Sequence, residues 1–97
     1  GLAIEAPAET GRAAYSYRGI PYALPPVAEL RWAPPEPYPR WHHVRPATSF
    51  GAVCPKDGVT GDSEDCLFLN IWTPRAAIER GAKRLPVMVF TGSFPTP

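Results

Sequence analysis

Proline is the feature that most constrains what this chain can fold into. Fourteen of its 97 residues are proline, whereas the usual share is about 5%. Proline fixes φ and removes a backbone N–H donor, so it interrupts helices and central strands. Because it recurs every few residues between positions 19 and 46, we expect an extended coil there, without any helix. Three Trp, four Tyr and four Phe residues provide bulky side chains to hold such a coil in place.

Strand patterns lie on both sides of this coil. Apolar residues alternate within residues 1–18, which predicts one or two edge strands. Residues 66–72 are apolar apart from Asn70, and residues 85–90 are apolar throughout, so we expect two strands that are buried on both faces. Residues 76–83 have the composition of a turn or so of helix.

Cover for the two buried strands is missing from the rest of the chain. A strand that is buried on both faces needs packed elements on each side, and no segment shows convincing amphipathic helical periodicity. A coil as long as residues 19–46 is also uncommon in a compact domain, where structureless loops rarely exceed about 15 residues. We therefore expect residues 1–97 to be a fragment of one larger domain and to contain no complete domain.

The charge balance and the cysteines argue against several kinds of partner. Ten Lys and Arg against nine Asp and Glu leave a net charge of +1, so we expect no nucleic-acid partner and no anionic membrane surface. No apolar stretch reaches the length of a membrane span, about 18 residues. Cys54 and Cys66 have no histidine between them and form no C-x-x-C pair, so we predict no metal site, and we expect no cofactor. From spacing alone, a short disulfide and two free thiols both remain open.

Three motifs follow one another along the chain. They read Y-R-G-I-P-Y-A-L-P-P at residues 17–26 with L-R-W at residues 30–32, S-E-D-C-L-F-L-N-I-W-T-P at residues 63–74, and L-P-V-M-V-F at residues 85–90. In this order they resemble the signatures of the carboxylesterase/cholinesterase (type-B carboxylesterase) family. The resemblance implies an α/β fold, with this chain as the N-terminal portion of an α/β-hydrolase domain, incomplete as given. According to the resemblance, this portion contains edge strands, a proline-rich coil, a disulfide loop and two core strands.

The resemblance also assigns roles to single residues. It implies a disulfide between Cys54 and Cys66, and with it a secreted or luminal origin in the secretory pathway. It places a structural ion pair on Arg31 and Glu64. Gly19 falls where the chain needs a tight turn that a Cβ atom would hinder.

The two apolar segments raise a question of pairing. Sequential strands are neighbours in about two-thirds of cases, which favours direct pairing of residues 67–72 with residues 85–90. The resemblance implies otherwise, because the family sheet places a strand from further downstream between the strands that these segments match. We therefore predict that the two segments cannot form their family sheet in this chain.

The catalytic residues of a serine esterase are missing from the sequence. The nucleophile of this fold lies in G-x-S-x-G, a pattern that occurs nowhere in the 97 residues, so we assign no catalytic residue. His42 and His43 are the only histidines; neither matches the family's catalytic histidine, and we expect both to be exposed. Where the family continues with H-G-G-G, this chain has Gly92 and Ser93 without a histidine, and we interpret them as a degenerate oxyanion-hole region.

Three functions are compatible with these observations. In the first, the whole protein is a serine carboxylesterase that hydrolyses small-molecule carboxylic esters through an acyl-enzyme, and this piece is inactive alone. In the second it is a non-catalytic, cholinesterase-like adhesion or binding protein, and in the third a truncated product without function. Cholinesterases hold choline on a tryptophan inside the disulfide loop, whereas residues 55–65 contain no aromatic residue. We therefore favour a general carboxylesterase over an acetylcholine hydrolase.

Overall fold

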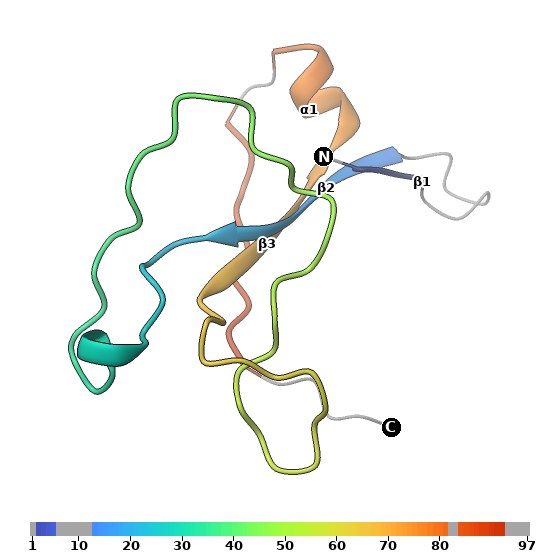
Figure 1. Cartoon of the computed structure of the whole chain (residues 1–97). Coiled ribbons are helices and arrows are strands. Elements are labelled where there is room, and N and C mark those ends of the chain that lie inside the picture. The colour runs from blue at the N-terminus through green and yellow to red at the C-terminus, as the bar shows by residue number, and fades with distance from the viewer. Residues whose placement is uncertain (1, 6–12, 82–83, 93–97) are drawn as a thin grey trace.

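The computed structural model of the chain describes residues 2–5, 13–81 and 84–92. These residues form a three-stranded antiparallel sheet in the order β1-β2-β3, together with a long coil that swings away from the sheet and returns to it (Figure 1). The elements are β1 (Leu2–Glu5), β2 (Ala13–Pro21), the 3-10 helix η1 (Ala28–Leu30), β3 (Phe68–Pro74) and α1 (Arg75–Glu79). No helix in the described ranges is long and apolar enough to cross a bilayer.

β2 is the central strand of the sheet. Strands are present within residues 1–18 as expected, but only β1 lies at an edge, because β3 pairs with the other side of β2. The segment thus holds one edge strand, within the one or two expected, and β2 is a central strand. Ser16 stands opposite Leu2 on one side and Trp72 on the other, and its side chain is fully buried.

A β-bulge interrupts the pairing of β2 with β3. The register shifts between Tyr17 and Ile20, and Gly19 adopts φ +71° there. The Gly19 N–H donates to Oδ1 of Asn70 over 3.0 Å, so the first motif is bonded to the second. A Cβ atom on Gly19 would lie 2.5 Å from the carbonyl oxygen of Ser49. Both the positive φ and this close approach require glycine.

We expected a coil without any helix, but the coil contains one short 3-10 turn, η1. The chain has seven residues without proline between Pro26 and Pro34, and η1 forms within them. A 3-10 turn needs only i→i+3 hydrogen bonds, so a few proline-free residues suffice. Ala28 and Trp32 have φ values of +52° and +65°, and the backbone turns sharply at both positions.

The coil is tied to itself and to the sheet by backbone hydrogen bonds. The Leu24 N–H donates to the Glu36 carbonyl and the Arg18 N–H to the Ala47 carbonyl, each over 2.8 Å. Ala23 and Ala47 are buried beside these ties. The radius of gyration is 16.1 Å, whereas a compact chain of this length has about 13 Å. The fold is therefore open, and the coil does not close over a hydrophobic core.

β3 is exposed, which corrects the expectation that residues 66–72 are buried on both faces. Leu69, Ile71 and Trp72 are 37%, 46% and 53% exposed. β3 pairs with β2 along one edge, and within the described residues no strand adds to its other edge. Burial of an apolar strand needs elements packed against its faces, and the described part of the chain does not place any there.

The second predicted strand, residues 85–90, is not a strand in the structure. The segment runs without regular secondary structure, and Val87, Met88 and Val89 are 84%, 94% and 80% exposed. It does not pair with β3, as we predicted. A strand is stable only when neighbouring strands satisfy its backbone groups, so the apolar sequence alone is not sufficient here.

The helical turn expected in residues 76–83 is present as α1. It begins at Arg75, directly after the last residue of β3, and ends at Glu79. Gly81 follows with φ +60°, the left-handed conformation that commonly ends a helix. The element is shorter than the predicted range and starts one residue earlier.

Candidate functional site

Two cysteines join the coil to the second motif. Cys54 and Cys66 form a disulfide with a Cα–Cα distance of 5.0 Å, as the resemblance implied. The Ser63 N–H also donates to the Val53 carbonyl over 2.9 Å, which closes the base of the loop. In the chain-entropy treatment, a disulfide that closes so short a loop stabilises by about 3 kcal/mol. We call Gly19, Asn70, Cys54 and Cys66 the motif junction, because their contacts join the first motif and the coil to the second motif.

The structure brings Arg31 and Glu64 together. The Nε atom of Arg31 lies 2.7 Å from Oε1 of Glu64, and the two side chains are 58% and 46% exposed. An ion pair this accessible to solvent contributes only about 0–1 kcal/mol. The ion pair mainly fixes geometry, because it connects the turn after η1 to the disulfide loop.

Gly92 and Ser93 were assigned to a degenerate oxyanion-hole region. Gly92 has φ +137°, a backbone conformation that residues other than glycine rarely adopt. It follows the exposed segment 85–90. Ser93 lies outside the described residues. An oxyanion hole needs N–H groups aimed at one point, and no element of the described chain packs around Gly92 to aim its N–H.

The two histidines lie on the coil and are exposed to solvent, as expected. Within the described residues, no group of three or more His, Cys, Asp or Glu side chains is arranged to hold a metal ion. His42 and His43 instead line a shallow hollow of about 510 Å³ together with Arg45.

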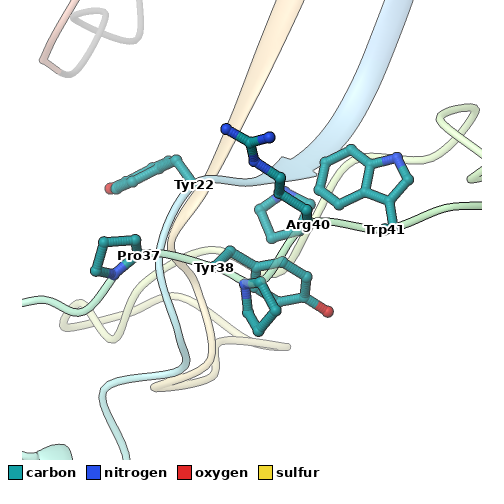
Figure 2. A pocket seen from close by; sticks show the side chains of 7 residues that line it. Tyr22, Pro37, Tyr38, Arg40 and Trp41 are labelled. Carbon is teal, nitrogen blue, oxygen red and sulfur yellow. The ribbon is translucent and has the colours of Figure 1, made fainter.

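A second hollow, of about 320 Å³, lies beside the first on the same coil (Figure 2). Tyr38 and Trp41 form the ridge between the two hollows, with ring centroids 6.0 Å apart in an edge-on arrangement. The guanidinium of Arg45 lies 5.4 Å from the Tyr38 ring and 5.5 Å from the Trp41 ring. Sequence reasoning treated Trp41 only as a packing group. The density of aromatic and basic residues at positions 38–45 was the signal that could have pointed to this surface.

A clasp formed by Tyr15, Arg75 and Glu79 fixes α1 to the sheet. Oε1 of Glu79 accepts hydrogen bonds from the Tyr15 hydroxyl and from Nε of Arg75, each 2.7 Å long. The hydrogen bond from Arg75, followed by that from Tyr15, lowers the pKa of Glu79. The hydrogen bond to Glu79 raises the pKa of Tyr15. The clasp is exposed and joins α1 to β2, so its role is to orient α1.

Comparison with solved structures defines the fold to which this arrangement belongs. The juvenile hormone esterase of Manduca sexta matches with a TM-score of 0.73 and 34% sequence identity, over 84% of this chain and 16% of that one. A carboxylesterase of Geobacillus stearothermophilus matches with a TM-score of 0.60 and 51% identity, over 65% of this chain and 13% of that one. The sheet, coil and disulfide loop are thus a portion of an α/β-hydrolase fold.

The sequence comparisons identify the family. Residues 3–93 match the model of the carboxylesterase family, and the chain belongs to this family. It is 42% identical over 91 residues to liver carboxylesterase 1 of Oryctolagus cuniculus, covering 76% of this chain. It is 37% identical over 90 residues to para-nitrobenzyl esterase of Bacillus subtilis, covering 84% of this chain. The chain spans 16% and 18% of the lengths of these relatives.

Proposed function

We propose that this chain is the N-terminal framework of a serine carboxylesterase, and that the whole protein hydrolyses small-molecule carboxylic esters through an acyl-enzyme. The motif junction is the observation that carries the proposal. It binds the bulge at Gly19 to Asn70 of the second motif, and the disulfide anchors the residues just before β3. These are structural contacts. Gly19, Asn70 and Cys66 lie in the segments that carry the family signatures, and Cys54 lies in the coil between them.

The framework supplies no chemistry of its own. A serine esterase needs a nucleophile with a base to activate it, and the G-x-S-x-G pattern occurs nowhere in the 97 residues. The isolated chain is therefore inactive, and residues 1–97 constitute part of one domain. The disulfide between Cys54 and Cys66 supports a secreted or luminal origin, because such bonds persist in oxidising compartments.

One feature favours a second candidate, a non-catalytic binding protein. In the family pattern, glycines after the third motif let backbone N–H groups converge on the oxyanion. Here Gly92 is the only glycine after that motif, and Pro95 and Pro97 remove two donors. A whole protein with this substitution would keep the framework and lose much of its transition-state stabilisation.

Two chimeras of the Bacillus subtilis para-nitrobenzyl esterase test both candidates. The first replaces only the segment that corresponds to residues 13–81, so the relative keeps its own oxyanion segment. The second extends the replacement to residue 97. Each is assayed with p-nitrophenyl acetate and labelled with an organophosphate, and the isolated chain is compared with a heat-denatured sample.

We expect the first chimera to turn over ester and to be labelled. The second should be slower by about 10²- to 10³-fold, the effect of losing one oxyanion donor. A first chimera that folds but has no activity would contradict the framework proposal. Equal activity of both chimeras would remove the argument for a non-catalytic protein. Saturable, organophosphate-sensitive turnover by the isolated chain would contradict its assignment as an inactive piece.

A further inference from the structure

The coil carries a surface that the esterase framework does not explain. The two hollows at Tyr38 and Trp41 are shallow and open to solvent, with volumes of about 320 Å³ and 510 Å³. Tyr22 and Trp41 remain 51% and 39% exposed beside them. Aromatic side chains that are held in place yet open to solvent offer flat apolar surface to a ligand.

The walls of the smaller hollow are held in place by local structure. The backbone on the Tyr22 side is joined to the Tyr38 side by the bridge between Ala23 and Pro37, next to the Leu24 hydrogen bond described above. Pro37 restricts the backbone further because its φ is fixed. A surface that is ordered before binding loses less conformational entropy when a ligand arrives.

The charge of the hollows points to an anion. Their linings include Arg40, Arg45, His42 and His43 and no acidic residue. Arg45 is engaged by the Tyr38 and Trp41 rings and donates from Nη1 to the Tyr38 hydroxyl over 3.4 Å. Within the described part of the chain, by contrast, the Arg40 guanidinium has no hydrogen-bond or ion-pair partner.

Arg40 is placed to complement a ligand that lies on the aromatic surface. Figure 2 shows its side chain rising between Tyr22 and Trp41, above the ridge that carries Tyr38. A guanidinium fork matches a carboxylate in geometry and charge. The flat rings on either side match an apolar body. A cationic ligand would meet repulsion from the same arginines.

We propose that this surface binds an organic monocarboxylate with a flat apolar body. The body lies against Tyr22 and Trp41, and the carboxylate accepts hydrogen bonds from Arg40. The site involves no ester chemistry, so its occupancy is measured on this chain independently of any hydrolytic activity.

Titration of the isotope-labelled, 97-residue chain tests the proposal by NMR. The probes are naphthoate, the uncharged naphthalenemethanol, and inorganic phosphate, each at millimolar concentration. The signals followed are the indole N–H of Trp41 and the amides of Tyr22 and Arg40. The variant is Arg40→Gln, and the matched control is Lys56→Gln, which removes a cation from the disulfide loop. Unchanged Leu24 and Glu36 amide signals verify that the coil of each variant is folded.

We expect naphthoate to shift these signals saturably and naphthalenemethanol to bind about tenfold more weakly, since only the carboxylate makes charge-assisted bonds. Arg40→Gln should weaken naphthoate about tenfold and leave naphthalenemethanol unchanged, whereas Lys56→Gln should match the parent chain. Four outcomes would overturn the proposal. These are no saturable shift, equal binding of acid and alcohol, retention of naphthoate affinity by Arg40→Gln, and displacement of naphthoate by an equal concentration of phosphate.

Discussion

The motif junction and the segment at residues 84–92 are both built from signature motifs of one family, yet they reach different states. At the junction, Gly19 is bonded to Asn70 and the disulfide restrains the residues that precede β3. In the second region, Val87 and Met88 are 84% and 94% exposed and no strand forms. The difference shows that an apolar motif becomes ordered only where its hydrogen-bonding and packing partners are present. The junction residues are joined by a hydrogen bond and a disulfide, whereas the later segment joins no sheet in the described residues.

Loss of the disulfide should have the largest effect on this contrast. Replacing Cys54 and Cys66 together with serine removes a restraint worth about 3 kcal/mol. Hydrogen exchange of the β2 and β3 amides should then accelerate strongly, while residues 84–92, already exposed, should exchange as before. Equal acceleration in both regions would show that the later segment depends on the junction after all. Unchanged β2 and β3 protection would mean that the disulfide does not stabilise the sheet.

Substitution of Gly19 should have the next largest effect, and Gly58 provides a matched control. The two glycines have φ values of +71° and +78°, so alanine meets similar backbone strain at both. Only at Gly19 would the new Cβ press on the Ser49 carbonyl, since Gly58 has open space around it. We expect Gly19→Ala to destabilise the sheet by about 2 kcal/mol more than Gly58→Ala. Urea titration of the β2 and β3 amide exchange measures the difference, and equal losses would contradict the close-approach argument.

Removal of the hydrogen bond to the Asn70 side chain should destabilise the sheet less than Gly19→Ala does. Asn70→Ala leaves the bulge without the acceptor for the Gly19 N–H, and one such hydrogen bond contributes about 1 kcal/mol. The Gly19 amide should lose its protection selectively. Asn70→Asp retains an acceptor and is the appropriate comparison. If the alanine and aspartate variants behave alike, the bond does not hold the bulge.

The clasp formed by Tyr15, Arg75 and Glu79 predicts that the stability of α1 depends modestly on pH. Glu79 has a lowered pKa in the folded chain, chiefly through Arg75 and then Tyr15, so its contribution to stability is present above the unfolded pKa of about 4.3. That contribution is lost as the pH falls through the lower folded pKa. The protection factors of the α1 amides, which are corrected for the pH dependence of intrinsic exchange, should therefore fall at acidic pH in the parent chain and stay constant over this window in Glu79→Gln. Parallel profiles for the two proteins would show that the clasp does not hold α1.

Charge introduced into the apolar segment should have the smallest effect on folding. Val87 is 84% exposed, and substitutions at such positions usually change stability by no more than about 0.5 kcal/mol. Val87→Lys should leave β2 and β3 protection unchanged but reduce self-association, because it interrupts an exposed apolar run. Analytical ultracentrifugation measures the association. A marked loss of sheet protection would place Val87 in contact with the sheet.

Several features of the candidate site could be predicted because they depend on local chemistry or on strong motifs. The disulfide and the contact of Arg31 with Glu64 follow from the signature segments, and Gly19 from the need for a conformation without a Cβ. The surface around Tyr38 and Arg40 could not be predicted in this way. Its shape arises when the bridge between Ala23 and Pro37 brings two parts of the coil together, and no local pattern encodes that distance.

The sequence by itself determined the family of this protein, its proline-rich coil and the absence of a nucleophile pattern. These properties depend on residue identity along the chain, since proline fixes φ wherever it occurs. Only the tertiary structure decided the central position of β2, the exposure of β3 and the irregular path of residues 85–90. Strand formation and burial depend on neighbours that supply hydrogen bonds and cover apolar faces. Similar apolar sequences therefore became a paired strand at β3 and an exposed segment without regular secondary structure at residues 85–90.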